Sequence, residues 1–389
     1  MISLALALAL LQAKPPPLPK DPSTLVRIVD QARLPHLAMD ADGGVYIAFV
    51  LKGNIALAVS TDGGATFAPP VIALDARGRD PTVPNRAPRV VVDRQKRVYV
   101  SAPLCLAAPN APVINDLYFA VSTDRGKTFG RAYMINDTAG SAADSVHWTA
   151  AGGAELHVAW LDLKGKGYSL SYAKFSDQGK RVSKTSTVAP FACEHCPPAL
   201  AVDGKGQPWV AWREAPRDPA AKTNRQVFVT TSTDGGKSFG AVTQLNTVDS
   251  GLEACPQEPP VIAVTADGKT IAAAWMDRRD LERDANVYWT FGPPGKLSRD
   301  TDVHDDRRFL QRRPSIAYEA DGTLWCAWED GRLSTQRVFY TNTKDVANIP
   351  LGDAKEGGGA SPSLAAAGGK VAIAYECGEG IGFRVLAGK

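Results

Sequence analysis

Three copies of one short phrase decide the fold of this chain. They are Ser60-Thr-Asp-Gly-Gly-Ala-Thr-Phe67, Ser122-Thr-Asp-Arg-Gly-Lys-Thr-Phe129 and Ser232-Thr-Asp-Gly-Gly-Lys-Ser-Phe239. A degenerate copy, Ser176-Asp-Gln-Gly-Lys180, lies in register with them, because the successive aspartates are 62, 53 and 57 residues apart. In each copy the Asp can bond amides of its own turn, a Gly can supply a positive φ, and the aromatic ring can pack between strands. The phrase therefore predicts a tight turn that recurs at a roughly constant spacing.

A longer repeat surrounds these turns. It consists of a Pro, an apolar alternating strand, a Gly-containing turn and a second apolar strand that ends in an aromatic residue. Copies start at residues 35, 88, 147, 198, 260, 314 and 362; the copy at 147 has His in place of Pro, and the copy at 88 lacks the closing aromatic residue. A third strand follows, for example Gln226-Val-Phe-Val-Thr-Thr231, and then a weaker fourth strand. Four short strands in each unit of 48 to 62 residues are typical of propeller blades.

Seven copies predict an all-β chain that forms a single β-propeller with four-stranded antiparallel blades. The seventh unit stops after its third strand, which covers Gly382-Phe-Arg-Val-Leu386. The upstream segment Thr24-Leu-Val-Arg-Ile-Val-Asp30 has the composition of a strand. We expect this N-terminal strand to complete the last blade and close the ring, since closure removes exposed strand edges. A propeller of six blades is the alternative.

With these turns and repeats, residues 25–389 resemble the sialidase-like, Asp-box (BNR repeat) β-propeller superfamily. The resemblance implies that Asp62, Asp124 and Asp234 are structural residues of the Asp-box turns. It also implies that these turns lie on one face of the ring, and that ligands bind on the opposite face. Sialidases have six blades, so a seven-bladed ring departs from their pattern.

Charged residues gather on the segments that form the expected ligand face. Sialidases bind a sugar carboxylate with three arginines, and the planar guanidinium group matches a carboxylate. Arg33-Leu-Pro35 resembles the Arg-Ile-Pro that opens the sialidase domain. Glu258 and Arg313 lie on segments of the same face. We therefore expect a glycan or another anionic small molecule to bind at an arginine-rich rim containing Arg33, Arg213, Glu214, Asp277, Arg279 and Arg312.

Two alternatives to this interpretation stay open. Trp275-Met-Asp-Arg-Arg279 and Trp328-Glu-Asp-Gly-Arg332 have a common Trp-x-Asp-x-Arg pattern, in which Asp and Arg can pair within one loop instead of binding a ligand. A sialidase-type glycoside hydrolase acting on acidic sugars needs a Tyr-Glu nucleophile, for which Tyr375-Glu376 is a loose candidate. The sequence identifies no complete catalytic set, so it favours binding without deciding whether the protein is an enzyme.

The cysteines form a second group of interest. Cys193 and Cys255 each lie five residues before the proline of their repeat, and Cys196 belongs to the motif Cys193-Glu-His-Cys196. Because equivalent positions of neighbouring blades lie close together, we expect a disulfide among these three residues in an exported protein. A Cys₃His site for zinc or copper, with His195 as the fourth ligand, is the alternative. It would make the chain a metal- or redox-linked extracytoplasmic protein. No other cofactor is expected.

The rest of the chain sets the context. Residues 1–13 form an apolar run that ends in Ala, as in a signal peptide, residues 14–23 resemble a Pro-rich linker, and residues 24–389 are the propeller domain. We therefore expect a secreted or periplasmic protein. A net charge of +3 gives no reason to expect nucleic acid as a partner. No later run of 18 apolar residues predicts a membrane span, and we expect a monomer.

Overall fold

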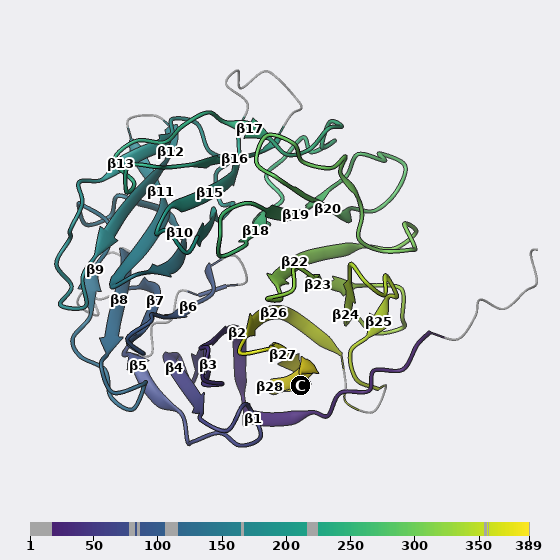
Figure 1. Cartoon of the computed structure of the whole chain (residues 1–389), viewed down its shortest axis with the longest axis horizontal. Helices are drawn as coiled ribbons and strands as arrows, with labels where there is room; N and C mark the ends of the chain where they lie inside the picture. Colours follow the sequence, from purple (N-terminus) through teal and green to yellow (C-terminus); the bar gives the residue numbers. More distant parts are fainter. Residues whose placement is uncertain are drawn as a thin grey trace, which may run out of the picture.

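The chain forms a ring of seven four-stranded antiparallel sheets around one axis (Figure 1). The computed structural model describes residues 18–77, 82–83, 86–105, 116–164, 167–215, 225–353, 356 and 358–388. The prediction of seven blades is confirmed, and the six-bladed alternative is wrong. No helix within these described ranges is long and apolar enough to cross a bilayer.

In each blade the first strand lies nearest the axis, and the first strands of neighbouring blades contact one another (Figure 1). Blade 1 comprises β2 (Ala32–Met39), β3 (Val45–Leu51), β4 (Asn54–Ser60) and β5 (Val71–Leu74). Blade 2 comprises β6 (Arg89–Val92), β7 (Val98–Leu104), β8 (Asp116–Ser122) and β9 (Tyr133–Met134). Blade 3 comprises β10 (Ala142–Gly152), β11 (Glu155–Lys164), β12 (Gly167–Phe175) and β13 (Ser186–Ala189). Blade 4 comprises β14 (Ala199–Val202), β15 (Pro208–Arg213), β16 (Val227–Thr231) and β17 (Thr243–Gln244).

The last three blades follow the same order, except that the outer strand of blade 7 comes from the N-terminus. Blade 5 comprises β18 (Val261–Val264), β19 (Ile271–Asp277), β20 (Asn286–Gly292) and β21 (Thr301–Asp302). Blade 6 comprises β22 (Gln311–Tyr318), β23 (Leu324–Asp330), β24 (Arg337–Asn342) and β25 (Ile349–Pro350). Blade 7 comprises β26 (Gly359–Ala367), β27 (Lys370–Cys377), β28 (Gly380–Gly388) and, as its outer strand, β1 (Val26–Asp30). Because β1 pairs with β28, the prediction of closure by an N-terminal strand is confirmed.

The predicted linker at the N-terminus contacts the propeller near its end. The predicted signal peptide at 1–13 lies outside the described residues, as does the first part of the predicted linker at 14–23. Asp21, near the end of that linker, accepts hydrogen bonds from the Tyr340 hydroxyl at 3.1 Å and the Gly352 amide at 2.8 Å. It also lies 3.4 Å from the Arg384 guanidinium. The contacts of the domain therefore begin before residue 24.

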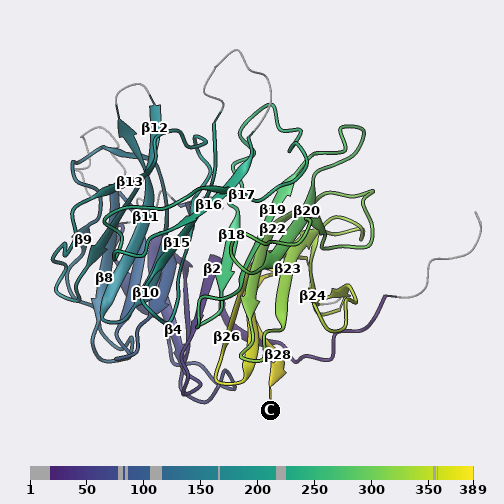
Figure 2. The same cartoon turned by 45° about the horizontal axis from the view of Figure 1, so that its top comes forward.

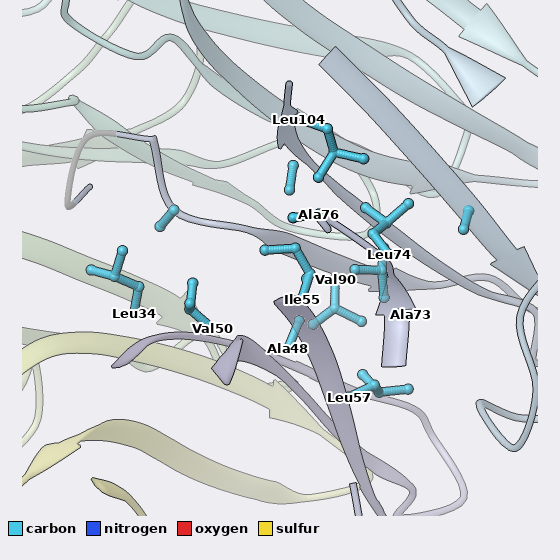
Figure 3. Close-up of a cluster of buried hydrophobic side chains, with 14 of the residues drawn as sticks. Leu34, Ala48, Val50, Ile55, Leu57, Ala73, Leu74, Ala76, Val90 and Leu104 are labelled. Atoms are coloured by element: carbon cyan, nitrogen blue, oxygen red, sulfur yellow. The ribbon is translucent and has the colours of Figure 1, made fainter. Parts of the chain in front are cut away.

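Apolar side chains fill the space between neighbouring blades. Successive side chains of a strand point to opposite faces, so a strand packed between two blades is apolar on both sides. Strand β7 shows this pattern, since all seven of its residues are buried. Figure 3 shows the cluster between the first two blades, where Val50 and Ile55 of blade 1 pack near Val90 and Leu104 of blade 2.

The Asp-box turns join the third and fourth strands. In the first copy, Asp62 accepts bonds from the Ser60 hydroxyl at 2.7 Å, the Thr66 amide at 2.9 Å and the Thr66 hydroxyl at 2.6 Å. These bonds hold the pKa of the Asp62 carboxyl well below its ordinary value. The same bonds recur around Asp124 and Asp234. These aspartates therefore stabilise turns.

The antiparallel order of the strands separates two ends of the ring. Inner strands such as β18 and β26 run from one end to the other (Figure 2). The chain enters each inner strand at one end, and the Asp-box turns lie at the opposite end. Residues that precede the inner strands therefore meet at the axial opening away from the Asp-boxes.

Candidate functional site

A pocket of about 230 Å³ lies at this axial opening. Its lining comes from the beginnings of the inner strands of six blades, all except blade 4. Most of the lining is apolar. Its polar and aromatic members include His36, Arg89, Trp148, Glu258 and Arg313.

One register position of the repeat supplies much of the lining. It is the residue directly after the repeat proline, or after His147 in the third copy. In six of the seven blades this residue lines the pocket: His36, Arg89, Trp148, Val261, Ser315 and Ser363. The repeat thus presents one side chain per blade to the axis, and the chemistry of the pocket depends on which residues occupy this position.

In three blades, the side chain at this position forms a hydrogen bond to the next blade. Each bond joins an acceptor side chain to a main-chain amide of the following blade. The bonds run from Leu37 N–H to Ser363 Oγ at 2.9 Å, from Leu364 N–H to Ser315 Oγ at 2.9 Å, and from Val90 N–H to His36 Nδ1 at 3.2 Å. At these three blades the residue therefore serves as a hydrogen-bond acceptor, whereas Trp148, Ala199 and Val261 at the same position have no side-chain acceptor.

Arg89 departs from this pattern, because a guanidinium group has donors and no acceptor. Only 8% of the residue is exposed, and its Cζ lies 3.8 Å from the ring centroid of Trp148. Within the described part of the chain, its Nε has no hydrogen-bond partner and the guanidinium forms no ion pair. Burial lowers the pKa of Arg89 to about 9, so the group stays charged at neutral pH. The pocket wall thus contains a buried cation without a carboxylate partner.

Glu258 lies on the other side of the pocket lining, beside Arg313. Arg313 forms a 2.8 Å ion pair with Glu329, and its Nε lies 3.6 Å from Glu258 Oε1. Burial raises the pKa of Glu258 to about 7, against the opposing charge of Arg313. Among the described residues, the buried Oε2 atom of Glu258 has no hydrogen-bond partner. Glu258 is therefore a carboxyl group that can exchange a proton near neutral pH.

The pocket rim contains a repeated backbone distortion. Leu34, Arg313 and Ser361 each precede a proline and have positive φ values of 57°, 50° and 51°. A register shift in the strand pairing accompanies each of them. Side-chain carboxylates stabilise two of these bulges: the Leu34 amide donates to Glu376 at 2.8 Å, and the Ser361 amide donates to Glu329 at 2.8 Å. Backbone strain of this kind is concentrated at functional sites.

Tyr375 and Glu376 do not form a hydrogen-bonded pair. The Tyr375 hydroxyl is buried and accepts a bond from Arg384 Nε at 2.9 Å, on a different side of strand β27 from Glu376. Glu376 accepts from the Leu34 amide and, at 3.2 Å, from the Ser361 hydroxyl. Neither residue belongs to the pocket lining.

The predicted arginines engage the protein itself. Arg213 is buried and donates to the main-chain carbonyls of Arg225 and Met276, both at 2.7 Å. Arg312 pairs with Glu329 at 2.8 Å. Arg33 and Glu214 are half-buried, interact with other residues, and lie outside the pocket lining.

The residues of the Trp-x-Asp-x-Arg motifs form hydrogen bonds and ion pairs with one another. Asp277 accepts from Trp275 Nε1 at 3.0 Å and from Arg279 at 2.7 Å, and Arg279 also pairs with Asp300 at 2.6 Å. Trp328, Asp330 and Arg332 form the equivalent arrangement in blade 6. This geometry matches the structural alternative for the motif.

The residues that line the pocket were mostly missed by sequence reasoning. The sequence pointed to charged residues at the ends of strands, such as Arg33 and Arg312, whereas the lining residues His36, Arg89 and Trp148 come one or more positions later in the inner strands or at a strand start. The missing signal was the register of the repeat: Arg89 stands at a position where the other six blades have His, Trp, Ala, Val, Ser and Ser.

The three candidate cysteines meet at this end of the ring. The Sγ atoms of Cys193 and Cys196 are 3.2 Å apart, as are those of Cys196 and Cys255. A disulfide has an S–S distance of about 2.05 Å, so the expected disulfide is not formed and the three are free thiols. Burial raises the pKa of Cys196, whereas hydrogen bonds from Cys193 and Cys196 lower the pKa of Cys255. His195 is not part of the group.

No family model and no curated protein sequence matches this chain. Solved structures match its shape. A polysaccharide lyase described as an ulvan lyase aligns with a TM-score of 0.60 at 9% identity, over 94% of this chain and 96% of its own. The NanB sialidase from Streptococcus pneumoniae aligns with a TM-score of 0.51 at 11% identity, over 80% of this chain and 68% of its own.

A sialidase from Trypanosoma rangeli, solved with the inhibitor DANA, aligns with a TM-score of 0.50 at 14% identity, over 82% of this chain and 56% of its own. Identities this low establish a common fold and nothing finer. In its fold, the chain is a seven-bladed β-propeller that is similar to these solved structures.

Proposed function

We propose that this protein binds an anionic glycan in the axial pocket, with Arg89 as the residue that recognises the negative charge. The observation that carries the proposal is the buried guanidinium of Arg89, which lines the pocket without a carboxylate partner among the described residues. Burying a charge is costly unless an opposite charge compensates it. A ligand carboxylate or sulfate in the pocket would supply that compensation through charge-assisted hydrogen bonds.

The remaining lining suits a sugar ring. Trp148 and His36 lie edge to face with centroids 5.8 Å apart, and both line the pocket. Pockets that bind small molecules combine such apolar and aromatic walls with a few polar groups that orient the ligand. The choice of a glycan also draws on the fold, since one structural neighbour is an ulvan lyase solved with -[GlcA(1-4)Rha3S]-, a ligand with an acidic sugar.

A second candidate function is cleavage of the bound glycan, with Glu258 as the proton donor. A general acid works best when its pKa is close to the working pH, and burial raises the pKa of Glu258 to about 7. The sialidase-type mechanism has less support, because it requires a tyrosine nucleophile and no tyrosine belongs to the pocket lining within the described residues. Binding alone therefore stays the first proposal.

The test is a panel of oligosaccharides matched in size but different in charge: uronate-containing, sialylated, sulfated and neutral. We expect micromolar to millimolar binding of at least one acidic class and at least tenfold weaker binding of its neutral counterpart. Equal affinity for acidic and neutral members, or no binding by any of them, would contradict the proposal.

The same panel decides between binding and cleavage. Fluorogenic sialosides report hydrolysis, and the ultraviolet absorbance of unsaturated uronates reports elimination. Turnover by the wild type that disappears in Glu258→Gln, while the affinity for the oligosaccharide is retained, would support cleavage as the function. Binding without turnover supports the first.

A further inference from the structure

Three cysteine sulfurs from two neighbouring blades converge on one point beside the axial pocket. The Sγ atoms of Cys193, Cys196 and Cys255 all lie within 4.8 Å of one another. Cys196 is equally distant from the other two, at 3.2 Å from each. Cys193 and Cys196 are almost fully buried, with 0% and 3% exposure, and Cys255 is half-buried.

The local backbone is shaped to bring these sulfurs together. The Cys193 amide donates to the Arg213 carbonyl at 2.7 Å, which attaches the motif to the end of strand β15. His195 has a φ of 62°, and the Cys196 amide returns to the Cys193 carbonyl at 3.4 Å. This tight turn places both sulfurs of the motif on the same side as Cys255, which precedes blade 5. A left-handed non-glycine residue is strained, so the turn requires compensation elsewhere.

A positive charge adjoins the sulfurs. Arg225 donates to Cys193 Sγ at 2.9 Å, and the carboxylate of Glu194 holds the same guanidinium through bonds of 3.0 and 2.8 Å. Hydrogen bonds from such outer groups orient metal ligands and offset the charge of thiolates. The arrangement therefore has an inner set of three sulfurs and a supporting set formed by Arg225 and Glu194.

From this geometry we propose that Cys193, Cys196 and Cys255 bind one soft d¹⁰ metal ion as three thiolates, with Cu(I) as the best match. The donor set contains sulfur alone, since no His, Asp or Glu donor among the described residues joins the group. Thiolates select Cu(I) and Zn(II) over harder ions. Zn(II) in structural sites is almost always four-coordinate, whereas the described residues supply three ligands. A disulfide would use two sulfurs and leave the third unused.

The bound ion would join blades 4 and 5 at the ligand-binding end. Cys255 is three residues from Glu258, which lines the axial pocket. Metal binding therefore holds the segment that positions this pocket wall. The site stands independently of any glycan, because its evidence is the sulfur cluster alone.

The test is an anaerobic titration of the reduced protein with Cu(I), in competition with a chromophoric Cu(I) chelator. We expect the protein to withhold one equivalent of Cu(I) from the chelator. Cys255→Ala should lose this binding, and Cys326→Ala, which removes a buried thiol in blade 6, should retain it. Circular dichroism establishes that both variants are folded. Copper should also raise the thermal midpoint of the wild type and of Cys326→Ala, but not that of Cys255→Ala.

Two results would overturn the proposal. One is a titration in which the wild type withholds no metal, or in which Cys255→Ala withholds as much as the wild type. The other is thiol counting on protein purified without reductant and unfolded with chelator present. Six free thiols are expected, and four would show that two of the cysteines form a disulfide instead.

Discussion

At the scale of single residues, the position directly after the repeat proline has two different roles. Ser315, Ser363 and His36 use it to accept an amide hydrogen bond from the next blade. Arg89 cannot accept such a bond, and its charge lies buried against Trp148. We infer a functional role for Arg89, because a buried charge costs stability and no other blade has an arginine or a lysine at this position.

This argument predicts that Arg89→Met leaves the fold as stable or makes it more stable. The lost cation–π contact is worth up to about 2 kcal/mol. The desolvation penalty of an unpaired buried ion is several kcal/mol, so we expect a net gain of about 1 kcal/mol or more in urea denaturation.

The matched control for this substitution is Arg97→Met, because Arg97 pairs at 2.7 Å with the fully buried carboxylate of Asp93. Breaking that pair should cost about 3 kcal/mol, because it leaves a buried charge behind. If Arg89→Met destabilised the protein as much as Arg97→Met, Arg89 would be a structural residue.

Glu258 predicts a specific pH dependence of stability. Its pKa is about 7 in the folded protein, raised from an ordinary value of 4.5 mainly by burial. The charge of Glu329 also raises this pKa, whereas the charges of Arg313 and Arg312 lower it. Between these two values the folded state binds a proton that the unfolded state does not, so stability falls as pH rises through this range. The loss reaches at most about 3 kcal/mol.

The measurement is urea denaturation of the wild type and Glu258→Gln at pH 5 and pH 8. The wild type should lose more stability between these pH values than the variant, because glutamine does not titrate. Parallel behaviour of the two proteins would show that Glu258 has an ordinary pKa.

At the scale of elements, the Asp-box turn attaches one blade to another as well as closing its own hairpin. Gly64 of the first turn faces Phe383 of blade 7, and an added Cβ would lie 2.1 Å from Phe383 Cε1. Phe67 of the same turn packs on Phe383 with ring centroids 5.3 Å apart. The glycine of the phrase is therefore required by the neighbouring blade in addition to its own φ of 92°.

Gly64→Ala should destabilise the protein by about 1 to 3 kcal/mol more than Gly43→Ala. The two glycines have nearly equal φ values of 92° and 88°, so the backbone cost of alanine is similar. At Gly43 an added Cβ meets nothing within 4 Å, whereas at Gly64 it displaces Phe383 from a buried cluster. Equal losses in thermal or urea unfolding would mean that the turn makes no important contact with blade 7.

The strands could be predicted from the sequence, because their patterns lie within short segments. The pocket could not be predicted, since its lining comes from residues far apart in the sequence. Alternation of apolar residues and the Asp-box phrases identified the strands and the ring closure. The bulges at Leu34, Arg313 and Ser361 have no local signature beyond the following proline. Arg89 and Trp148 come together only because blades 2 and 3 pack, and the partners that engage Arg213 and Arg279 likewise depend on the folded loops.

At the scale of the whole molecule, the ring depends on its closing strand. Strand β1 covers the edge of β28, and Val26, Ile28 and Val29 pack against the cluster between blades 7 and 1. Asp21 adds the contacts to Tyr340, Gly352 and Arg384 described above. These residues connect the two ends of the sequence within one sheet, so the closure stabilises the ring of seven blades.

Removing residues 1–30 should cost at least about 4 kcal/mol, from the lost apolar burial of β1, and should promote aggregation through the exposed edge of β28. The control removes residues 1–17 alone, which retains β1 and the Asp21 contacts. Thermal unfolding followed together with light scattering measures both effects. A shortened protein with the same midpoint as its control would show that the ring does not need this strand.

The central claim, that Arg89 makes the axial pocket a site for anionic glycans, is tested most directly by isothermal titration calorimetry. The ligand is the tightest acidic oligosaccharide of the panel, titrated into the wild type, Arg89→Met and Arg308→Met. Arg308 is an exposed arginine, with 72% of its side chain accessible, so its removal changes the net charge equally without altering the pocket. Loss of a charge-assisted bond predicts roughly 10- to 100-fold weaker binding by Arg89→Met and unchanged binding by Arg308→Met. Equal affinity of Arg89→Met and the wild type would contradict the claim.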